Sequence, residues 1–150
     1  MRNLILVLGD PLDLAGAALR AGDPVLDQVL MIETLAEARH VWSHGQRVVL
    51  FLAAMRHFRR ELEQAGWQVY YRDLGSQVAD LGTGLRNAIE ELQPERVRLT
   101  EAGEWRVAEL VTRICATAGS PVDVLPDTHF FCSTSEFAGL ARGRRQLLME

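Results

Sequence analysis

Short apolar runs alternate along this chain with segments of helical period. Five consecutive aliphatic residues, Leu4 to Leu8, are followed directly by Gly9-Asp10-Pro11. A half-exposed strand would alternate apolar and polar side chains, so this run predicts a strand buried on both faces. Shorter apolar runs predict four more strands, at 29–32, 69–74, 96–100 and 122–125.

The segments between these runs predict helices. Apolar residues recur at three- and four-residue spacing over 46–64, 85–92 and 104–118, and a short helix is expected within 13–21. Gly66 and Gly119 follow two of these segments as stop signals, whereas 34–45 has no clean period and is expected to be loop with some helical turns. The alternation predicts an α/β, three-layer Rossmann-like domain: five parallel strands in the order 3-2-1-4-5, with helices on both faces.

The last part of the chain breaks this alternation. Ser133 and Glu136 form a capping box before a helix that is expected to end near Arg142. Phe130 and Phe131 are interpreted as packing residues, which together with Leu147 and Leu148 are expected to form an exposed apolar patch in this chain. A new apolar segment begins at 146–150, which we interpret as the start of a region that continues in a longer protein.

The predicted strand order places a ligand crevice between the first and fourth strands, where the order reverses. Gly9 and Asp10 follow the first strand, Thr100 and Glu101 end the fourth, and Glu33 ends the second. Carboxylates at this edge commonly accept hydrogen bonds from ligand hydroxyl or ring N–H groups. In the alternative interpretation, Asp10 and Glu101 only cap the turns that follow them.

Composition narrows the possible chemistry. The chain has 150 residues, a net charge of −4 and no lysine, which excludes mechanisms that need a P-loop or Schiff-base lysine. The net negative charge of this domain does not favour binding to the phosphates of nucleic acid. The first apolar run is too short to span a bilayer and lacks the features of a signal peptide, so a cytoplasmic location without a membrane partner is expected. Cys115 and Cys132 are expected to be reduced core thiols.

Other candidate motifs are weak. Gly82-Thr83-Gly84 lacks the third glycine of a dinucleotide fingerprint, and the sequence contains neither a Walker motif nor a Gly-x-Ser-x-Gly elbow. Glu37, His40 and His44 could share a helical face as metal ligands, although local hydrogen bonding is the more common role of such histidines. The basic cluster at 142–145 is interpreted as the solvated end of a helix, in preference to a docking surface for another domain or for DNA. No catalytic residue is assigned.

Four blocks of the sequence resemble one protein family. They are Leu8-Gly9-Asp10, Ala54-Met55-Arg56-His57-Phe58, Thr100-Glu101-Ala102-Gly103-Glu104-Trp105-Arg106-Val107 and Gly143-Arg144-Arg145-Gln146-Leu147-Leu148-Met149-Glu150. These blocks are similar to the bacterial deoxyribodipyrimidine photolyase-related proteins, which comprise iron-sulfur bacterial cryptochromes and prokaryotic (6-4) photolyases. The resemblance extends from residue 4 to residue 150.

The resemblance implies that residues 1–150 are a photolyase/cryptochrome-type amino-terminal antenna domain. It further implies an antenna chromophore, 6,7-dimethyl-8-ribityllumazine, and a helical partner domain, absent from this chain, that holds FAD and a four-iron cluster (4Fe-4S). DNA would be contacted only through the full-length protein. Gly9, Asp10, Glu37 and Glu101 match family motif positions. Pro11 and the stretch 43–47 differ from the family and lie beside the expected pocket, where Pro11 removes a backbone donor.

Two other functions remain open from the residues alone. One is a stand-alone α/β domain that binds a small molecule or nucleotide in a regulatory role. The other is a small hydrolase that uses Asp10 and Glu101, for which no activating group is evident. If the parent is a photolyase-related protein, its substrate-reading residues would lie in the other domain, so its lesion preference does not follow from this sequence.

Overall fold

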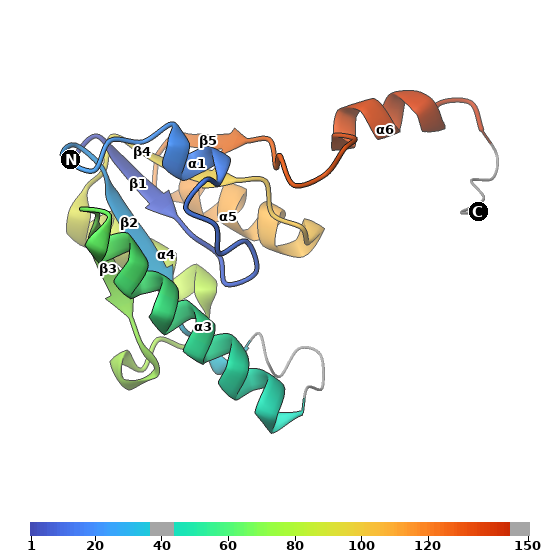
Figure 1. Cartoon of the computed structure of the whole chain (residues 1–150). Helices are drawn as coiled ribbons and strands as arrows, with labels where there is room; N and C mark the ends of the chain where they lie inside the picture. The colour runs from blue at the N-terminus through green and yellow to red at the C-terminus, as the bar shows by residue number, and fades with distance from the viewer. Residues whose placement is uncertain (37–43, 145–150) are drawn as a thin grey trace.

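The computed structural model describes residues 1–36 and 44–144 and contains one five-stranded sheet (Figure 1). All neighbouring strands are parallel and their order is β3-β2-β1-β4-β5, which confirms the predicted topology. The strands are β1 (Asn3–Leu6), β2 (Gln28–Ile32), β3 (Gln68–Arg72), β4 (Arg96–Thr100) and β5 (Val122–Leu125).

Helices cover both faces of this sheet, as predicted (Figure 1). One core cluster joins the sheet to α4 and α5, and a second joins it to α1 and α3. The described helices are α1 (Ala17–Arg20), α3 (Gly45–Gln64), the 3-10 turn η1 (Leu74–Ser76), α4 (Leu81–Leu92), α5 (Trp105–Thr117) and α6 (Thr134–Ala141).

The central strand supplies side chains to both cores. Leu4 and Leu6 pack with α4 and α5, whereas Ile5 and Val7 pack with α1 and α3, because successive side chains of a strand point to opposite faces. All four residues of β1 are buried, which confirms the prediction of a strand covered on both sides. The regular strand ends at Leu6, although Val7 and Leu8 remain buried beyond it.

Glycines end two long helices as the sequence predicts. Gly66 and Gly119 follow α3 and α5 with φ of +90° and +67°. At the end of α3, the N–H of Trp67 donates to the carbonyl of Leu62 and the N–H of Gly66 donates to that of Glu63. This is the Schellman pattern, which needs a left-handed residue and therefore favours glycine.

Several element boundaries differ from the predicted ones. α4 begins at Leu81 and not at residue 85, because the side chain of Asp80 caps it by accepting from the N–H of Thr83. Gly84 lies inside this helix where a Cβ would be 2.9 Å from Cδ1 of Ile32, so the glycine permits close packing on β2. The helix expected within 13–21 is one turn, α1.

The end of the described chain lies outside the core. The predicted capping box is present, since Ser133 accepts from the N–H of Glu136 while Glu136 accepts from that of Ser133. Phe130 and Phe131 are exposed, as expected for an uncovered apolar patch. α6 extends away from the sheet (Figure 1), so these side chains have no layer of the domain to pack on.

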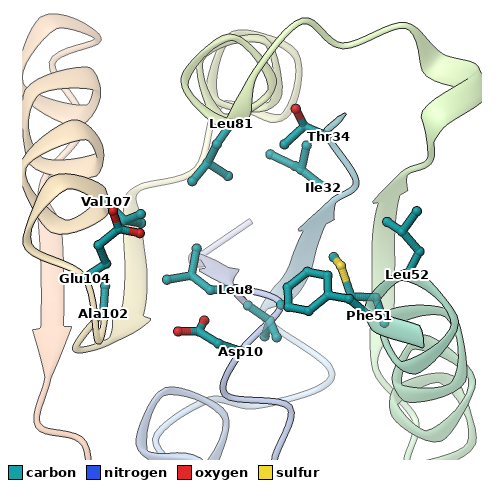
Figure 2. A pocket seen from close by; sticks show the side chains of 13 residues that line it. Leu8, Asp10, Ile32, Thr34, Phe51, Leu52, Leu81, Ala102, Glu104 and Val107 are labelled. Atoms are coloured by element: carbon teal, nitrogen blue, oxygen red, sulfur yellow. The ribbon is translucent and has the colours of Figure 1, made fainter. Parts of the chain in front are cut away.

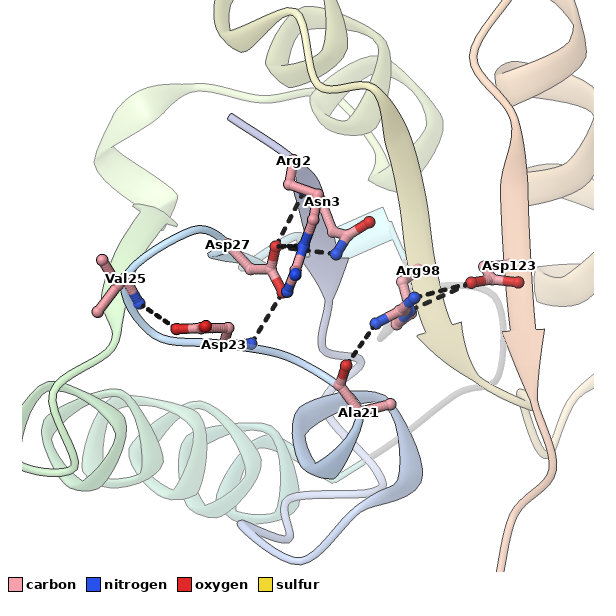
Figure 3. Close-up of polar contacts among 8 residues, drawn as sticks. All are labelled: Arg2, Asn3, Ala21, Asp23, Val25, Asp27, Arg98 and Asp123. Atoms are coloured by element: carbon pink, nitrogen blue, oxygen red, sulfur yellow. Dashed lines mark hydrogen bonds and ion pairs between the residues drawn. The ribbon is translucent and has the colours of Figure 1, made fainter.

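A buried carboxylate fastens the amino ends of the strands. The carboxylate of Asp27 accepts from the Arg2 guanidinium, from the Asn3 side chain and from the N–H of Asp23 (Figure 3). These bonds satisfy a charged group that would be costly to bury alone. The candidate site described below lies at the opposite, carboxyl end of the sheet.

Candidate functional site

A cavity of about 130 Å³ opens at the carboxyl ends of β1, β2 and β4, where the strand order reverses (Figure 2). This is the crevice that the strand pattern predicts. Its wall is mostly apolar and comes from the strand ends, from α3 and from the starts of α4 and α5. The lining residues are Val7, Leu8, Gly9, Asp10, Ile32, Thr34, Phe51, Leu52, Met55, Leu81, Ala102, Glu104 and Val107.

Gly9 and two side chains of α3 form one side of the cavity. A Cβ at Gly9 would lie 2.4 Å from Cζ of Phe51 and 3.0 Å from Sδ of Met55. Figure 2 shows Phe51 reaching from α3 toward the loop that follows β1. The missing side chain of Gly9 therefore lets the phenyl ring cover this end of the cavity.

Asp10 supplies a carboxylate at the rim. Burial raises the pKa of this carboxyl group, and the neighbouring carboxylates of Glu104 and Asp127 raise it further. Glu104 begins α5 and pairs with Arg106, at 2.8 Å between Oε1 and Nε. Asp10 is thus an exposed acceptor at the rim, beside apolar walls, an arrangement suited to a ligand N–H or O–H donor.

A second hollow, of about 300 Å³, shares Asp10 with the cavity. Its lining contains the further acidic groups Asp13, Glu101 and Asp127, together with His129. The apolar cavity and the polar hollow therefore meet at a single carboxylate.

Glu33 has a different role from the one that its position suggested. Its carboxylate is fully buried and accepts hydrogen bonds from Nε and Nη2 of Arg56, at 2.6 and 2.8 Å. It also accepts from the hydroxyl of Tyr71 at 2.6 Å and from the N–H of Leu74 at 3.1 Å. Burial opposes ionisation, but these hydrogen bonds outweigh it and lower the pKa of Glu33. Glu33 is absent from the cavity lining and joins α3 and β3 to the end of β2.

The predicted residues of β4 also lie beside the cavity rather than in it. Thr100 accepts from the N–H of Ala18 at 3.2 Å, and so fixes α1 on the sheet. Glu101 lines the polar hollow and accepts from the hydroxyl of Thr134 at 2.8 Å. Of the six predicted ligand contacts, the structure places Gly9 and Asp10 in the cavity, and Glu37 lies outside the described residues.

Sequence reasoning missed most of the apolar wall. Phe51 and Met55 belong to a helical period that predicted only core packing, and Leu81 lies in a segment that was expected to be loop, so no local signal distinguished them as lining residues. Glu104 was present in a quoted motif but was not assigned to the site. Pro11, which differs from the family, lines the polar hollow.

The polar side chains of the cavity lining are those of Asp10, Thr34 and Glu104, and the lining contains no Ser, Cys, His or Lys. In residues 1–36 and 44–144, no group of three or more His, Cys, Asp and Glu is placed to hold a metal ion. The possible ligands Glu37 and His40 lie outside this part.

Two other sequence predictions concern the general character of the chain. Cys115 is buried, and burial raises the pKa of its thiol to about 11, as fits a core cysteine. Cys132 is exposed, so its assignment to the core was wrong, because the segment before α6 leaves the body of the domain. None of the helices within the described ranges is long and apolar enough to cross a membrane.

Comparisons with known proteins agree with this architecture. A model of the family described as deoxyribodipyrimidine photo-lyase-related protein matches residues 5–150. A (6-4) photolyase of Agrobacterium fabrum is 36% identical over 152 residues, which cover 100% of this chain. The chain spans 30% of that relative's length. By this match along almost its entire length, the chain belongs to the deoxyribodipyrimidine photo-lyase-related protein family.

Proposed function

We propose that residues 1–150 form an antenna domain, which binds a light-harvesting chromophore for a photolyase-related protein. The observation that supports this function is the apolar cavity at the sheet's switch point, with the Asp10 carboxylate on its rim. Flat aromatic ligands favour apolar walls, and a small number of polar groups fixes their orientation. The chromophore that we propose is 6,7-dimethyl-8-ribityllumazine.

The described residues fit part of this ligand directly. A volume of about 130 Å³ is below the roughly 300 to 1,000 Å³ of typical ligand pockets, so the cavity would hold an edge of the ring system. The ribityl chain would extend past Asp10 into the polar hollow of about 300 Å³. Asp10 would accept from a ring N–H or a hydroxyl group at the junction, and Glu37 is proposed as a second acceptor.

Such a chromophore, when bound, absorbs near-ultraviolet or blue light and passes the excitation to a flavin. The residues of this chain have the simpler tasks of holding the ring, excluding water from its faces and accepting its hydrogen bonds. Phe51 and Met55 would contact the ring from α3, and Leu81 and Val107 would contact it from the starts of α4 and α5.

We propose that a helical domain of the same parent protein holds FAD and a 4Fe-4S cluster and completes the activity. Light-driven DNA repair or blue-light signalling would then require that domain, and DNA would be bound only by the larger protein. The exposed side chains of Phe130, Phe131, Phe137 and Leu140 support such a partner, since several large apolar groups exposed in one segment commonly mark an interface.

Titration of the 150-residue chain with 6,7-dimethyl-8-ribityllumazine, followed by ligand fluorescence, tests the proposal. Asp10→Ala should lower affinity by about one to two decades, because a lost hydrogen bond to a charged acceptor costs roughly 1.5 to 3 kcal/mol. Glu109→Ala changes an exposed carboxylate on α5 that is absent from both linings, and should bind as the unaltered chain does.

Circular dichroism should show the same folded content in both variants. Equal affinity in the unaltered chain and in Asp10→Ala would show that the ligand does not bind in this cavity. Binding of a mononucleotide in place of the lumazine would favour the stand-alone regulatory function instead.

A further inference from the structure

Residues 126–133, which we name the strap, leave the carboxyl end of β5 and lead away from the sheet to α6 (Figure 1). The strap and the first residue of α6 each contact a loop at the carboxyl end of the sheet. His129 reaches Asp13 in the loop after β1, and Thr134, at the start of α6, donates to Glu101 in the loop after β4. These ties set the position at which α6 leaves the domain.

His129 lies between two carboxylates. Its Nδ1 is 2.6 Å from Oδ1 of Asp127 and its Nε2 is 3.2 Å from Oδ2 of Asp13. Each carboxylate is held in place, since Oδ1 of Asp127 also accepts the N–H of His129 and Oδ1 of Asp13 accepts that of Ala15. The imidazole is therefore fixed between groups that can only accept when they are ionised.

A neutral imidazole cannot satisfy both contacts. It carries one N–H and one lone pair, whereas the imidazolium carries two N–H donors. Loss of a proton would leave a lone pair facing one carboxylate. The contact to Asp127 is the shorter one and lies within a local turn, so the contact to Asp13 is the one that fails.

The geometry points to a proton-controlled pin: the imidazolium of His129 fastens the strap to the loop after β1, and its deprotonation releases the strap from that loop. This device goes beyond chromophore binding and does not depend on it. It makes the position of α6, with its exposed Phe137 and Leu140, depend on pH.

The charges around His129 all favour the protonated form. Asp127 and Asp13 contact the ring, and Asp10 and Glu101 line the same hollow, whose lining contains no Arg. The hydrogen bond to Asp127 is the largest cause of a raised pKa for His129, and Asp13 adds to it. The pin is thus complete below about pH 6.5, the ordinary value for histidine, and is lost as the pH rises through the raised pKa.

Cys132 provides a probe at the end of the strap. It is exposed, while Cys115 is buried, so a nitroxide reagent should label Cys132 alone. We expect the electron paramagnetic resonance spectrum of the nitroxide to show an immobilised label at pH 5.5 and to gain a mobile component at higher pH. The midpoint should lie above about 6.5 and coincide with the NMR titration of the His129 ring.

Three variants make the test specific. The label should be mobile at every pH in His129→Gln. In Asp13→Asn it should be more mobile than in the unaltered chain, and the midpoint should be lower because one carboxylate that raises the pKa of His129 is lost. Thr134→Val removes the other tie and should enlarge the pH-dependent change. His57→Gln alters an exposed histidine on α3 and is the matched control, with an unchanged profile.

Circular dichroism at both pH limits confirms that each variant is folded. A label mobility that does not change with pH would overturn the pin. So would a pH profile that persists in His129→Gln, or a midpoint in Asp13→Asn that equals that of the unaltered chain.

Discussion

Gly9 and Phe51 are in such close contact that a Cβ on Gly9 would lie 2.4 Å from Cζ of Phe51. Gly9 follows the central strand and Phe51 lies on α3, so this contact joins the switch point of the sheet to the helix that covers it. The phenyl ring is 45% exposed and is therefore able to turn outward if it is displaced. The cavity wall depends on this pair.

Gly9→Ala should destabilise the domain by about 1 kcal/mol, at the low end for an overpacked site, because Phe51 can rotate toward solvent. It should also lower lumazine affinity, since the displaced ring no longer closes the cavity. Urea denaturation and ligand titration measure the two effects. Gly139→Ala is the matched control: a Cβ there meets nothing within 4 Å, and alanine favours the α6 helix. An unchanged affinity in Gly9→Ala would contradict the role of this contact.

Arg56→Met should destabilise the domain by about 2 kcal/mol. The substitution leaves the buried carboxylate of Glu33 without its cation, which costs roughly 3 to 5 kcal/mol for a fully buried pair. Arg56 is 54% exposed, so a smaller loss is expected. Arg113→Met, which changes an exposed arginine on α5, is the control and should cost under about 0.5 kcal/mol. Equal losses in the two variants, by urea denaturation, would show that the Glu33 contact contributes no more than a surface arginine does.

Asp27 should make the domain sensitive to acid. Burial opposes its ionisation, but the bonds from Arg2, Asn3 and Asp23 prevail and lower its pKa to about 2. Because the unfolded pKa is higher, near 3.9, the stabilisation is complete above about pH 5 and is lost as the pH falls toward 2. A shift of this size corresponds to about 2.5 kcal/mol at neutral pH.

Urea denaturation between pH 7 and pH 3 checks this expectation with Asp27→Asn. The variant should be less stable at pH 7 and should lose less stability on acidification than the unaltered chain. Glu109→Gln is the control and should keep the original slope. If Asp27→Asn keeps that slope too, another carboxylate governs the acid response.

The surface formed by Phe130, Phe131, Phe137 and Leu140 should bind a hydrophobic dye or promote self-association. Phe131 is fully exposed and Leu140 is 62% exposed, and apolar surface of this kind gains free energy when it is covered. Phe131→Ser with Leu140→Gln should reduce both effects, measured by dye fluorescence and light scattering. Val25→Ser, at an exposed valine in the loop before β2, is the control. A monomer that binds no dye would argue against an interface here.

The light-driven repair that we propose for the larger protein should be missing from this chain. Among the described residues no group of three or more His, Cys, Asp and Glu is placed to hold a metal ion, and the cavity lining contains no Ser, Cys or His. We therefore expect no flavin absorption and no light-driven repair from residues 1–150 alone. Repair of a lesion-containing oligonucleotide by the purified chain under illumination would contradict this expectation.

The local sequence determined the sheet and the place of its site. Leu4 to Leu8 form an unbroken apolar run, which is typical of a strand covered on both faces, and the alternation with helical periods favours parallel neighbours. Strand order then places Gly9 and Asp10 at the switch point whatever the side-chain packing. These features follow from periodicity and chain connection, which can be recognised within short segments.

Tertiary structure decided how the individual side chains are used. Glu33 ends a strand at the expected edge, but Arg56 and Leu74, 23 and 41 residues further along the chain, occupy its oxygens. Phe51 has the same local pattern as any core residue and becomes a cavity wall only because Gly9 lies opposite it. Phe131 and Cys132 are apolar enough for a core, yet they are exposed because the strap carries them beyond the last layer. Partner choice and burial depend on contacts between distant segments, and these arise only when the layers pack together.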